Sequence, residues 1–375
     1  MKICYFGNPQ SIHLQRWMRH FIDKGHEVHV MTLEPCEIEG AHIHDISAST
    51  PSIFYRLPII CRIFDFWHER YETKIRRILL EEIKPDILDA HYLTSYGIPA
   101  SRLRFHPFII TIWGSDVLLA PKRFGKKHVA LMKKALRKVD VILCSGENTK
   151  KETIKLVREP EKVKLISFGV DTQKFYPKPK DEKLWSSLGI LDSQTVISIR
   201  NFELVYDIET LIKTIPLVLS QAPDTIFVIA GDGSLRDYLE ELAKSLGIWE
   251  NVRFVGWIPH DELCEYLASA DIYVSTSLSD SGPSVSLLEA MSCGLPAVVT
   301  NVGDVKKWVR NGENGFVVPT GNLNVLALSI VRLLHNKDER DRLGQANRQM
   351  VEVKVNWQKT MGEVEDIYEG LIRGC

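Results

Sequence analysis

Short apolar runs alternate with helical patterns along the entire chain, and no other feature restricts its fold as strongly. In the first half, residues 12–24 have helical periodicity and end at Gly25. Parallel strands that are buried on both faces read as continuous apolar runs separated by helices, so this alternation predicts an α/β domain with a doubly wound parallel sheet. The apolar runs of this half span residues 2–7, 26–32, 86–91, 107–114, 140–145 and 163–169.

The alternation restarts after residues 176–183, where the segment YPKPKDEK lacks apolar periodicity and is typical of a linker. A further helix is predicted near residues 208–220. A chain of 375 residues is also too long to form a single hydrophobic core of ordinary size. We therefore expect Rossmann-like domains at residues 1–178 and 184–356, which face each other across a cleft at the carboxyl ends of both sheets. The second set of runs spans residues 195–200, 225–231, 252–257, 271–277, 296–300 and 315–319.

Composition is typical of a globular protein on the cytoplasmic side of the membrane. Hydrophobic residues make up 45% and charged residues 25% of the chain, which argues against disorder. The seven cysteines are odd in number and have no paired spacing, so we expect reduced thiols without a disulfide framework or a zinc site. Because the first residues already form a predicted strand, we expect no signal peptide, and no apolar run is long enough to span a membrane.

The formal net charge of −1 conceals an asymmetry, because residues 1–180 carry +10 and the remainder carries −11. Residues 121–138 contain eight Lys and Arg and no acidic residue, while residues 52–77 mix aromatic side chains with Arg and Lys. Such stretches suit a surface that lies on anionic lipid, or a solvated basic helix beside a core helix. The charge is accompanied by no recognised nucleic-acid motif, so we expect no nucleic-acid partner.

Residues 279–300, SDSGPSVSLLEAMSCGLPAVVT, predict a small polar turn that leads into a short helix and then a strand. Pro283 suits the first helical position, and Gly294 suits the end of the helix. A helix that starts after such a loop offers N–H groups and a positive dipole end to an anion. Glu289 lies about 9 Å along the axis from the start of this helix. This is roughly the distance from a bound diphosphate to the far hydroxyls of a ribose. We favour nucleotide diphosphate binding over a plain helix–strand connection with a solvated Glu.

Two other strand ends in the second half carry residues that suit phosphate chemistry. Arg200 ends the first apolar run, where a permanent charge could stabilise a leaving diphosphate or could belong to an ordinary surface Arg. The turn AGDGS follows the next run, and its Gly231 permits close backbone approach. Capping of the next helix by Asp232 or Ser234 would explain the same turn.

Polar residues also gather where three predicted strands of the first half end, beginning at Gly7. Because the carboxyl ends of parallel strands share one edge of a sheet, these residues predict a substrate pocket more readily than three unrelated helix caps. The histidines among them are individually more often structural than catalytic. The candidates for binding an acceptor are Ser11, His13, His91, Trp113 and Asp116.

Together these motifs resemble the retaining glycosyltransferases of family 4, which have the GT-B fold of two facing Rossmann-like domains. The resemblance runs from Met1 to Cys375 and is most specific in SLLEAMSCGLPAVVT, ISFGVDTQKFYP and the stretch that starts at GDGSLRDYL. It implies that residues 357–375 form a tail helix that crosses back onto the first domain. It also implies that Glu289 holds the donor's ribose and that Arg200 stabilises the departing diphosphate. The predicted donor-binding residues besides these two are Gly7, Tyr206, Gly231, Trp257, Ile258, Ser281, Gly282, Pro283, Ser284 and Val285.

The chain departs from the pattern of this family at three positions. Ser281 stands where the first Glu of the family's pair is expected, with Asp280 one residue away. Tyr206 replaces the Lys that usually accompanies the Arg, and Trp113 stands where many relatives have His. A neutral phenol cannot supply the charge of Lys, so more of the leaving-group stabilisation falls to Arg200 or to a basic residue from elsewhere.

The resemblance implies a retaining, hexosyltransferase-type enzyme that moves a sugar from a UDP- or GDP-linked donor to a glycan or lipid-linked acceptor in polysaccharide biosynthesis. Neither a cofactor nor a metal is expected, and the protein would work in the cytoplasm or peripherally on the inner face of the membrane. Two alternatives stay open. A nucleotide-sugar epimerase or a phosphorylase could share the fold, and a non-catalytic glycan- or lipid-binding relative could have lost activity with the first Glu and the Lys.

Overall fold

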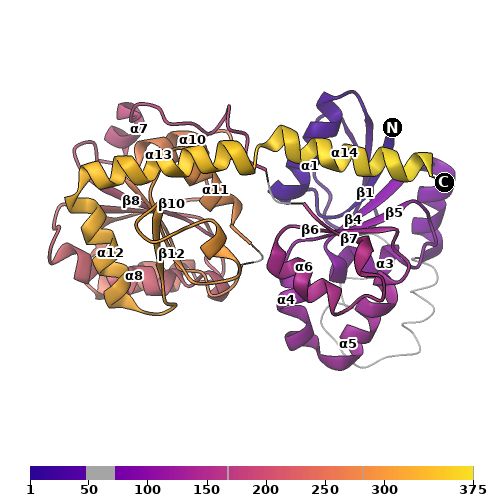
Figure 1. Ribbon diagram of the computed structural model, residues 1–375, viewed down its shortest axis with the longest axis horizontal. Coiled ribbons are helices and arrows are strands. Elements are labelled where there is room, and N and C mark those ends of the chain that lie inside the picture. The colour runs from indigo at the N-terminus through magenta and orange to yellow at the C-terminus, as the bar shows by residue number, and fades with distance from the viewer. Residues whose placement is uncertain (48–71, 167–168, 281, 375) are drawn as a thin grey trace. The chain divides into compact units, whose positions relative to one another are not determined.

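The computed structural model divides into two compact units (Figure 1). Unit 1 comprises Met1–Ser167 and Met361–Cys375, and unit 2 comprises Phe168–Thr360. Val170 and Phe175 are buried in the core of unit 2, so this unit begins before the boundary that the sequence predicts at residue 178. The described residues are 1–47, 72–166, 169–280 and 282–374.

Unit 1 is built on a parallel sheet of seven strands in the order β3-β2-β1-β4-β5-β6-β7. The strand order turns back between β1 and β4, because β1 pairs with both β2 and β4. Every strand except β3 begins inside a predicted apolar run; the sequence AHIHD gives no such run at the sheet edge. The strands are β1 Lys2–Phe6, β2 Glu27–Thr32, β3 Ala41–Asp45, β4 Ile87–His91, β5 Phe108–Ile112, β6 Val141–Cys144 and β7 Val163–Leu165.

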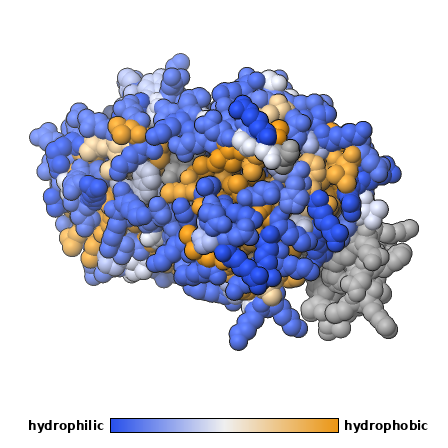
Figure 2. Space-filling model, turned by 45° about the vertical axis from the view of Figure 1, so that its right-hand side comes forward, coloured by the Kyte–Doolittle hydropathy of each residue, from blue (hydrophilic) through white to orange (hydrophobic). Residues whose placement is uncertain are grey.

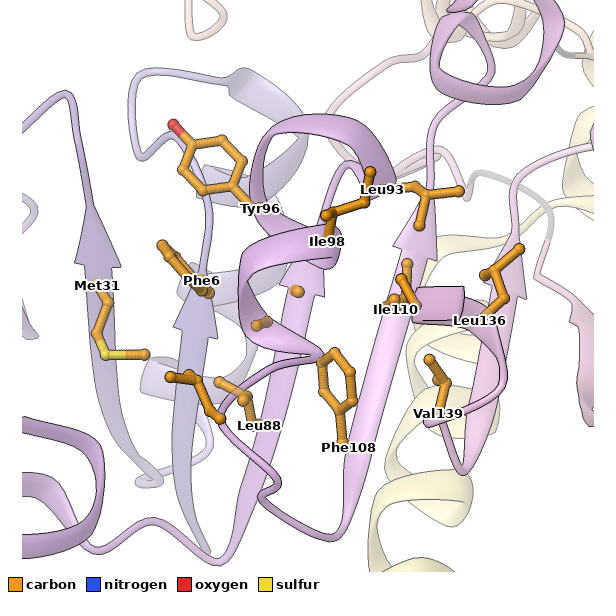
Figure 3. Packing of buried hydrophobic residues seen from close by; sticks show 14 of the residues in the cluster. Phe6, Met31, Leu88, Leu93, Tyr96, Ile98, Phe108, Ile110, Leu136 and Val139 are labelled. Carbon is orange, nitrogen blue, oxygen red and sulfur yellow. The ribbon is translucent and has the colours of Figure 1, made fainter. Parts of the chain in front are cut away.

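Helices cover both faces of this sheet. On one face, Phe6, Leu88 and Phe108 pack in a cluster with Tyr96 and Ile98 from the segment that follows β4 (Figure 3). On the other face, the Phe21 ring of α1 stacks on Tyr368 of α14 with ring centroids 5.2 Å apart. The helices are α1 Ile12–Asp23, α3 Ile98–Ala100, α4 Ser115–Leu118, α5 Ala120–Leu136, α6 Glu147–Ile154 and α14 Trp357–Arg373, with π-helical turns at Ile78–Ile83 and Leu93–Gly97 and a 3₁₀ turn at Pro160–Lys162.

Unit 2 contains a parallel sheet of six strands in the order β10-β9-β8-β11-β12-β13. Its order turns back between β8 and β11, because β8 pairs with both β9 and β11. All six strands lie within predicted apolar runs, so the α/β, doubly wound reading is confirmed. The strands are β8 Thr195–Ile199, β9 Ile226–Ala230, β10 Val252–Gly256, β11 Ile272–Ser275, β12 Ala297–Thr300 and β13 Gly315–Val318.

Two apolar clusters flank the second sheet. One contains Tyr273 and Ala297 of the sheet with residues of α10, α11 and α13, and the other contains Phe227 and Val298 with residues of α8, α9 and α12. Polar caps fix several helix starts, as where Asp207 accepts a hydrogen bond from the Thr210 N–H at the start of α8. The helices are α7 Glu182–Ser187, α8 Ile208–Leu219, α9 Arg236–Ser245, α10 Leu263–Ser269, α11 Val285–Ser292, α12 Leu323–His335 and α13 Lys337–Lys354, with 3₁₀ turns at Leu204–Tyr206, Trp249–Asn251 and Val305–Lys307.

Candidate functional site

Arg200 directly follows β8, at the point where the strand order of unit 2 turns back toward β11. Ligands of open α/β sheets bind outside the carboxyl ends of the strands at such a switch point. The guanidinium donates from Nε to Ser275 Oγ (3.2 Å) and Ser277 Oγ (3.1 Å), and from Nη2 to Ser277 Oγ (2.8 Å) and to Asp280. Its side chain is only 9% exposed, so the interpretation as an ordinary surface Arg is wrong.

Neighbouring groups keep the Arg200 charge in place. Burial opposes that charge, but Asp280, Tyr273 and Tyr206 outweigh burial and raise the pKa of Arg200. Burial raises the pKa of Asp280, although the charge of Arg200 works in the opposite direction. The Tyr206 ring centroid lies 4.9 Å from Arg200 Cζ, within the range of a cation–π contact. Tyr206, which replaces the Lys expected from the family resemblance, therefore contacts Arg200 through its ring and adds no second positive charge.

Ser284 is the N-cap of α11, and its Oγ accepts a hydrogen bond from the Leu287 N–H at 3.2 Å. Pro283 therefore precedes the cap, and the prediction that it occupies the first helical position is wrong, because a serine hydroxyl caps this helix. Gly294 has φ +78° just beyond the C-cap, as predicted for the helix end. Ser281 lies outside the described residues. The described part of the predicted loop is Gly282, Pro283, Ser284 and Val285, of which the first two are buried.

Glu289 lies on α11 and is buried, so the interpretation as a solvated Glu is wrong. Its Oε1 lies 2.9 Å from His260 Nε2, and His260 Nδ1 lies 3.2 Å from Lys174 Nζ. An ammonium can only donate, so Nδ1 accepts from Lys174 and Nε2 carries the proton toward Glu289. Lys174 is held in turn by Asp261 at 2.5 Å. No sequence motif marks His260, although its place after the apolar run of β10 puts it at the same edge of the sheet.

Gly231 lets the loop after β9 close against Arg200. Its N–H donates to the Gly256 carbonyl at 2.8 Å, and an added Cβ would lie 2.1 Å from the Arg200 carbonyl oxygen. The predicted capping of α9 by Asp232 or Ser234 is wrong, because Leu235 is the N-cap and makes no side-chain cap. Position 231 therefore needs a glycine, because the Arg200 backbone lies too close for a side chain.

Trp257 and Ile258 follow β10 and have opposite surroundings. The Trp257 side chain is 66% exposed, whereas Ile258 is buried and packs into one of the apolar clusters of unit 2. An exposed indole can stack on a flat ligand. The Ile258 side chain is committed to that cluster.

An aromatic cluster occupies the carboxyl ends of β1, β4 and β5 in unit 1. The His13 ring stacks on Trp113 with ring centroids 4.6 Å apart, and the His91 ring lies 5.3 Å from the Trp113 ring and 5.0 Å from the Trp17 ring. His91 is buried, and neither ring nitrogen makes a hydrogen bond within the described residues, although Nε2 lies 3.4 Å from Asp89 Oδ2. An added Cβ at Gly7 would lie 3.3 Å from His91 Cβ, so these segments approach closely. The structure thus brings His13, His91 and Trp113 together.

Of the other two acceptor candidates, Asp116 has structural surroundings. Asp116 has no exposed surface and accepts hydrogen bonds from the N–H groups of Leu93 (3.0 Å), Trp113 (3.4 Å) and Gly114 (2.8 Å). Burial raises the pKa of Asp116, and these hydrogen bonds partly offset the rise. Asp116 ties the loops after β4 and β5 together and offers nothing to an acceptor, contrary to the prediction. Ser11 is the N-cap of α1 and makes no side-chain cap there.

The basic stretch forms α5 and its flanks, with a break in helical geometry at Gly125, where φ is +75°. Phe124 is 53% exposed among exposed Lys and Arg side chains, and Arg123 Cζ lies 5.3 Å from its ring centroid. Hydrophilic residues predominate on the face shown in Figure 2, and hydrophobic ones gather in separate areas. No helix in the described part of the chain is long and apolar enough to cross a membrane. Of the predicted aromatic and basic stretch, residues 52–71 lie outside the described residues.

Comparison with known proteins gives matches over both units. Among its relatives, N-acetyl-alpha-D-glucosaminyl L-malate synthase of Bacillus anthracis is 24% identical over 95% of this chain and 92% of its own length. A GDP-mannose-dependent alpha-(1-6)-phosphatidylinositol monomannoside mannosyltransferase of Mycobacterium tuberculosis is 22% identical over 96% of each chain. Both relatives therefore align with nearly the whole of this chain.

Solved structures match the same extent of the chain. Sucrose-phosphate synthase from Thermosynechococcus elongatus superposes with a TM-score of 0.82 at 18% identity, and covers 100% of both chains. Anabaena Alr3699/HepE in complex with UDP-glucose superposes with a TM-score of 0.81 at 17% identity, over 99% of this chain and 100% of that chain. At this identity the likeness establishes the fold.

Two family models account for most of the sequence. The model described as glycosyl transferase 4-like matches residues 2–146, in unit 1. The model described as glycosyl transferases group 1 matches residues 180–350, in unit 2. The chain therefore belongs to the group 1 glycosyltransferases of family 4 and has the GT-B fold.

Proposed function

We propose that this glycosyltransferase uses a nucleotide diphosphate sugar, UDP- or GDP-linked, and retains the configuration of the sugar. The observation that carries the proposal is Arg200, a buried guanidinium at the switch point of unit 2 that pairs with Asp280 just before α11. A fixed Arg and the start of a helix both attract phosphate oxygens. The names of the relatives add support, since one is GDP-mannose-dependent and one solved structure holds UDP-glucose.

In the proposed reaction, the bond between the sugar C1 and the diphosphate oxygen breaks while a bond from C1 to the acceptor oxygen forms on the same face. The acceptor hydroxyl gives its proton to the departing diphosphate, so no enzyme nucleophile is involved. Negative charge develops on the leaving oxygen, where Arg200 and the N–H groups at the start of α11 would stabilise it. The proposal needs no resident cofactor or metal.

Glu289 would anchor the donor through its ribose hydroxyls. A buried carboxylate accepts two hydroxyl hydrogen bonds well when its own orientation is fixed. His260 supplies that fixation, because its Nε2–H donates to Glu289 Oε1 and its Nδ1 is held by Lys174. Trp257, exposed after β10 on the same sheet edge, would stack on the base.

The acceptor would be a glycan or a lipid-linked glycan held by unit 1. The stacked His13 and Trp113 rings form a flat surface of the kind that packs on the apolar face of a sugar ring. The basic surface of α5, with Phe124 exposed near the start of the helix, would let the protein lie on the inner face of the membrane beside a lipid-linked acceptor.

Kinetics of two variants test the donor assignment. Arg200→Ala should lower kcat by roughly 10²- to 10³-fold, since the lost interaction strengthens as the phosphate leaves. Glu289→Gln should mainly weaken donor binding, measured by calorimetry with UDP and GDP. Arg310→Ala, which removes an exposed Arg paired with Glu313, is the matched control. Wild-type turnover by Arg200→Ala would refute the assignment.

Product analysis separates the proposed reaction from its alternatives. NMR of the product should show the donor's anomeric configuration preserved in a new glycosidic bond. An epimerase would convert the nucleotide sugar without any acceptor, and a non-catalytic binder would give no product at all. Either result would replace the proposal.

Vesicle flotation tests the membrane surface. The protein should float with vesicles of anionic lipid at low salt and remain unbound to zwitterionic vesicles. Phe124→Glu, on an exposed side chain that contributes nothing to the core, should abolish flotation. A wild-type chain that stays unbound at low salt would rule out this role for α5.

A further inference from the structure

Four polar side chains share one face of the sheet in unit 1, at its β2–β3 edge. Glu27 and His29 are two residues apart on β2, so their side chains point to the same face. The parallel register places His42 of β3 directly opposite His29, and His44 follows two residues later on the same face. This cluster takes no part in the donor or acceptor sites described above.

The ligand atoms of three of these residues already lie close together. One nitrogen or oxygen from each of Glu27, His29 and His42 falls within 4.8 Å of the others. His29 Nε2 lies 2.9 Å from Glu27 Oε1, and the His29 and His42 ring centroids are 4.7 Å apart. Around a tetrahedral ion with bonds of 2.0 to 2.2 Å, ligand atoms lie about 3.4 Å apart. Small side-chain rotations would therefore bring all three onto one ion.

We propose that Glu27, His29 and His42 bind a divalent ion of the zinc class, which joins the edge strand β3 to β2. Two imidazoles and a carboxylate suit zinc, and also cobalt, nickel and copper, better than magnesium or calcium. Glu27 and His42 are exposed while His29 is buried, so an ion can enter from solvent and meet a ligand that the sheet already holds in place. Sequence spacing gives no metal motif here, because His42 comes from a different strand.

His44 orients the central ligand. His29 Nδ1 lies 2.9 Å from His44 Nε2. An ion on Nε2 of His29 leaves the proton of that ring on Nδ1, where it is donated to His44. Such an outer hydrogen bond fixes both the tautomer and the orientation of a ligating histidine.

Lys2 competes with the ion for the carboxylate. Its Nζ lies 2.9 Å from Glu27 Oε1, the same atom that faces His29. A bound cation would displace this ammonium, which is partly exposed and can turn toward solvent. The affinity of the site is therefore set partly by how readily Lys2 leaves.

Binding would stabilise the edge of the sheet. In the described residues β3 pairs with β2 alone, and its AHIHD sequence contributes few apolar contacts. An ion held across the two strands binds the folded form more tightly than the unfolded chain, so it adds stability that grows with its free concentration.

Metal titration of the untagged full chain tests the proposal. Zn²⁺, measured in competition with a chelating dye, should bind with one ion of highest affinity per chain. His42→Ala and Glu27→Gln, which alter exposed residues, should each weaken that binding at least tenfold, roughly the effect of losing a ligand. His335→Ala, on an exposed histidine outside the cluster, should leave it unchanged. Wild-type affinity in both cluster variants, or no saturable binding by the wild-type chain, would overturn the proposal.

Two further measurements identify the ligands and the competitor. Co²⁺ at the site should give tetrahedral ligand-field bands. It should not give the thiolate-to-cobalt charge-transfer band that would arise at Cys264 and Cys293, whose Sγ atoms lie 4.0 Å apart in unit 2. Lys2→Met should tighten Zn²⁺ binding several-fold and enlarge the rise in melting temperature on adding Zn²⁺. A thiolate band, or weaker binding by Lys2→Met, would contradict the assignment. Circular dichroism of each variant confirms that the fold is intact.

Discussion

The two sheets turn back at equivalent places, between β1 and β4 in unit 1 and between β8 and β11 in unit 2, yet their carboxyl edges carry different chemistry. In unit 1 this edge holds the stacked rings of His13 and Trp113 beside His91. In unit 2 it holds a buried Arg200 with its carboxylate partner and a buried Glu289 with its imidazole partner. One fold thus presents an aromatic surface at one switch point and an ionic one at the other.

The difference lies in what the carboxylates do. In unit 1, Asp116 accepts three backbone N–H groups and Asp89 accepts from Thr111 and Tyr368, so both carboxylates are committed to holding the fold. In unit 2, Asp280 instead pairs with the permanently charged guanidinium of Arg200, and Glu289 meets the imidazole of His260. An edge of the second kind suits an anionic donor, whereas an edge of the first kind suits a neutral sugar.

The largest effect on stability that we expect comes from the glycines at these two edges. Gly231→Ala should lower the free energy of unfolding by about 2 kcal/mol or more, because its Cβ would meet the Arg200 carbonyl at 2.1 Å and its φ is +137°. Gly7→Ala should cost about 1 kcal/mol or less, because the nearest atom is the end of the Leu14 side chain at 2.7 Å. Urea unfolding of both variants measures the difference. Equal losses would mean that the two edges are packed alike.

Trp113→Ala should separate the two edges in kinetics. Loss of the stacked surface should raise the acceptor KM by about tenfold, while the affinity for UDP or GDP stays at the wild-type value. Trp249→Ala, which removes a 40% exposed indole of unit 2, is the matched control and should change neither quantity. A weaker nucleotide affinity in Trp113→Ala would show that the aromatic edge also serves the donor.

His260 should act as a positioning residue for Glu289. His260→Ala should weaken donor binding by about fivefold with kcat at saturating donor unchanged, because one hydrogen bond to the carboxylate is lost. His260→Gln keeps an N–H donor on a side chain of similar reach and should restore most of the affinity. Calorimetry and steady-state kinetics measure the two effects. A fall in kcat that Gln does not rescue would place His260 in the chemical step instead.

Most of the fold can be predicted from the sequence, because strands buried on both faces leave continuous apolar runs. The exceptions have physical reasons. β3 carries histidines at the sheet edge, where one side is not covered by another strand, so no apolar run marks it. The segment after Phe175 reads as a linker because of its prolines, but the residues just before it are buried in unit 2.

The candidate site is predictable in position more than in detail. Arg200 and Glu289 are found from the sequence because one ends a strand and the other has a fixed place on a helix. Their partners Asp280 and His260 lie on loops, whose conformation depends on tertiary packing that spacing does not encode. Asp116 is misassigned for the same reason, since a sequence cannot show whether a carboxylate meets solvent or backbone N–H groups.

The smallest expected effect concerns the charge balance of the ionic edge. Burial raises the pKa of Asp280 above its ordinary value of 3.8. Between pH 3.8 and the raised pKa of Asp280, the folded chain binds more protons than the unfolded chain. The contribution of Asp280 to the free energy of unfolding is therefore complete below pH 3.8. It is lost as the pH rises through the raised pKa. Asp280→Asn lacks this loss, so its stability relative to wild type should increase with pH through that window, as measured by urea unfolding.

The same substitution sharpens the contrast in binding. Asn leaves one fewer negative charge beside the diphosphate, so Asp280→Asn should bind UDP or GDP roughly two- to threefold more tightly at neutral pH, with a smaller gain at high salt. The gain should shrink as the pH falls toward the raised pKa, because the wild-type carboxyl then becomes neutral as well. Taking the ratio of the two affinities cancels the titration of the nucleotide's own phosphate. A ratio independent of pH would show that the Asp280 charge is not felt by the diphosphate.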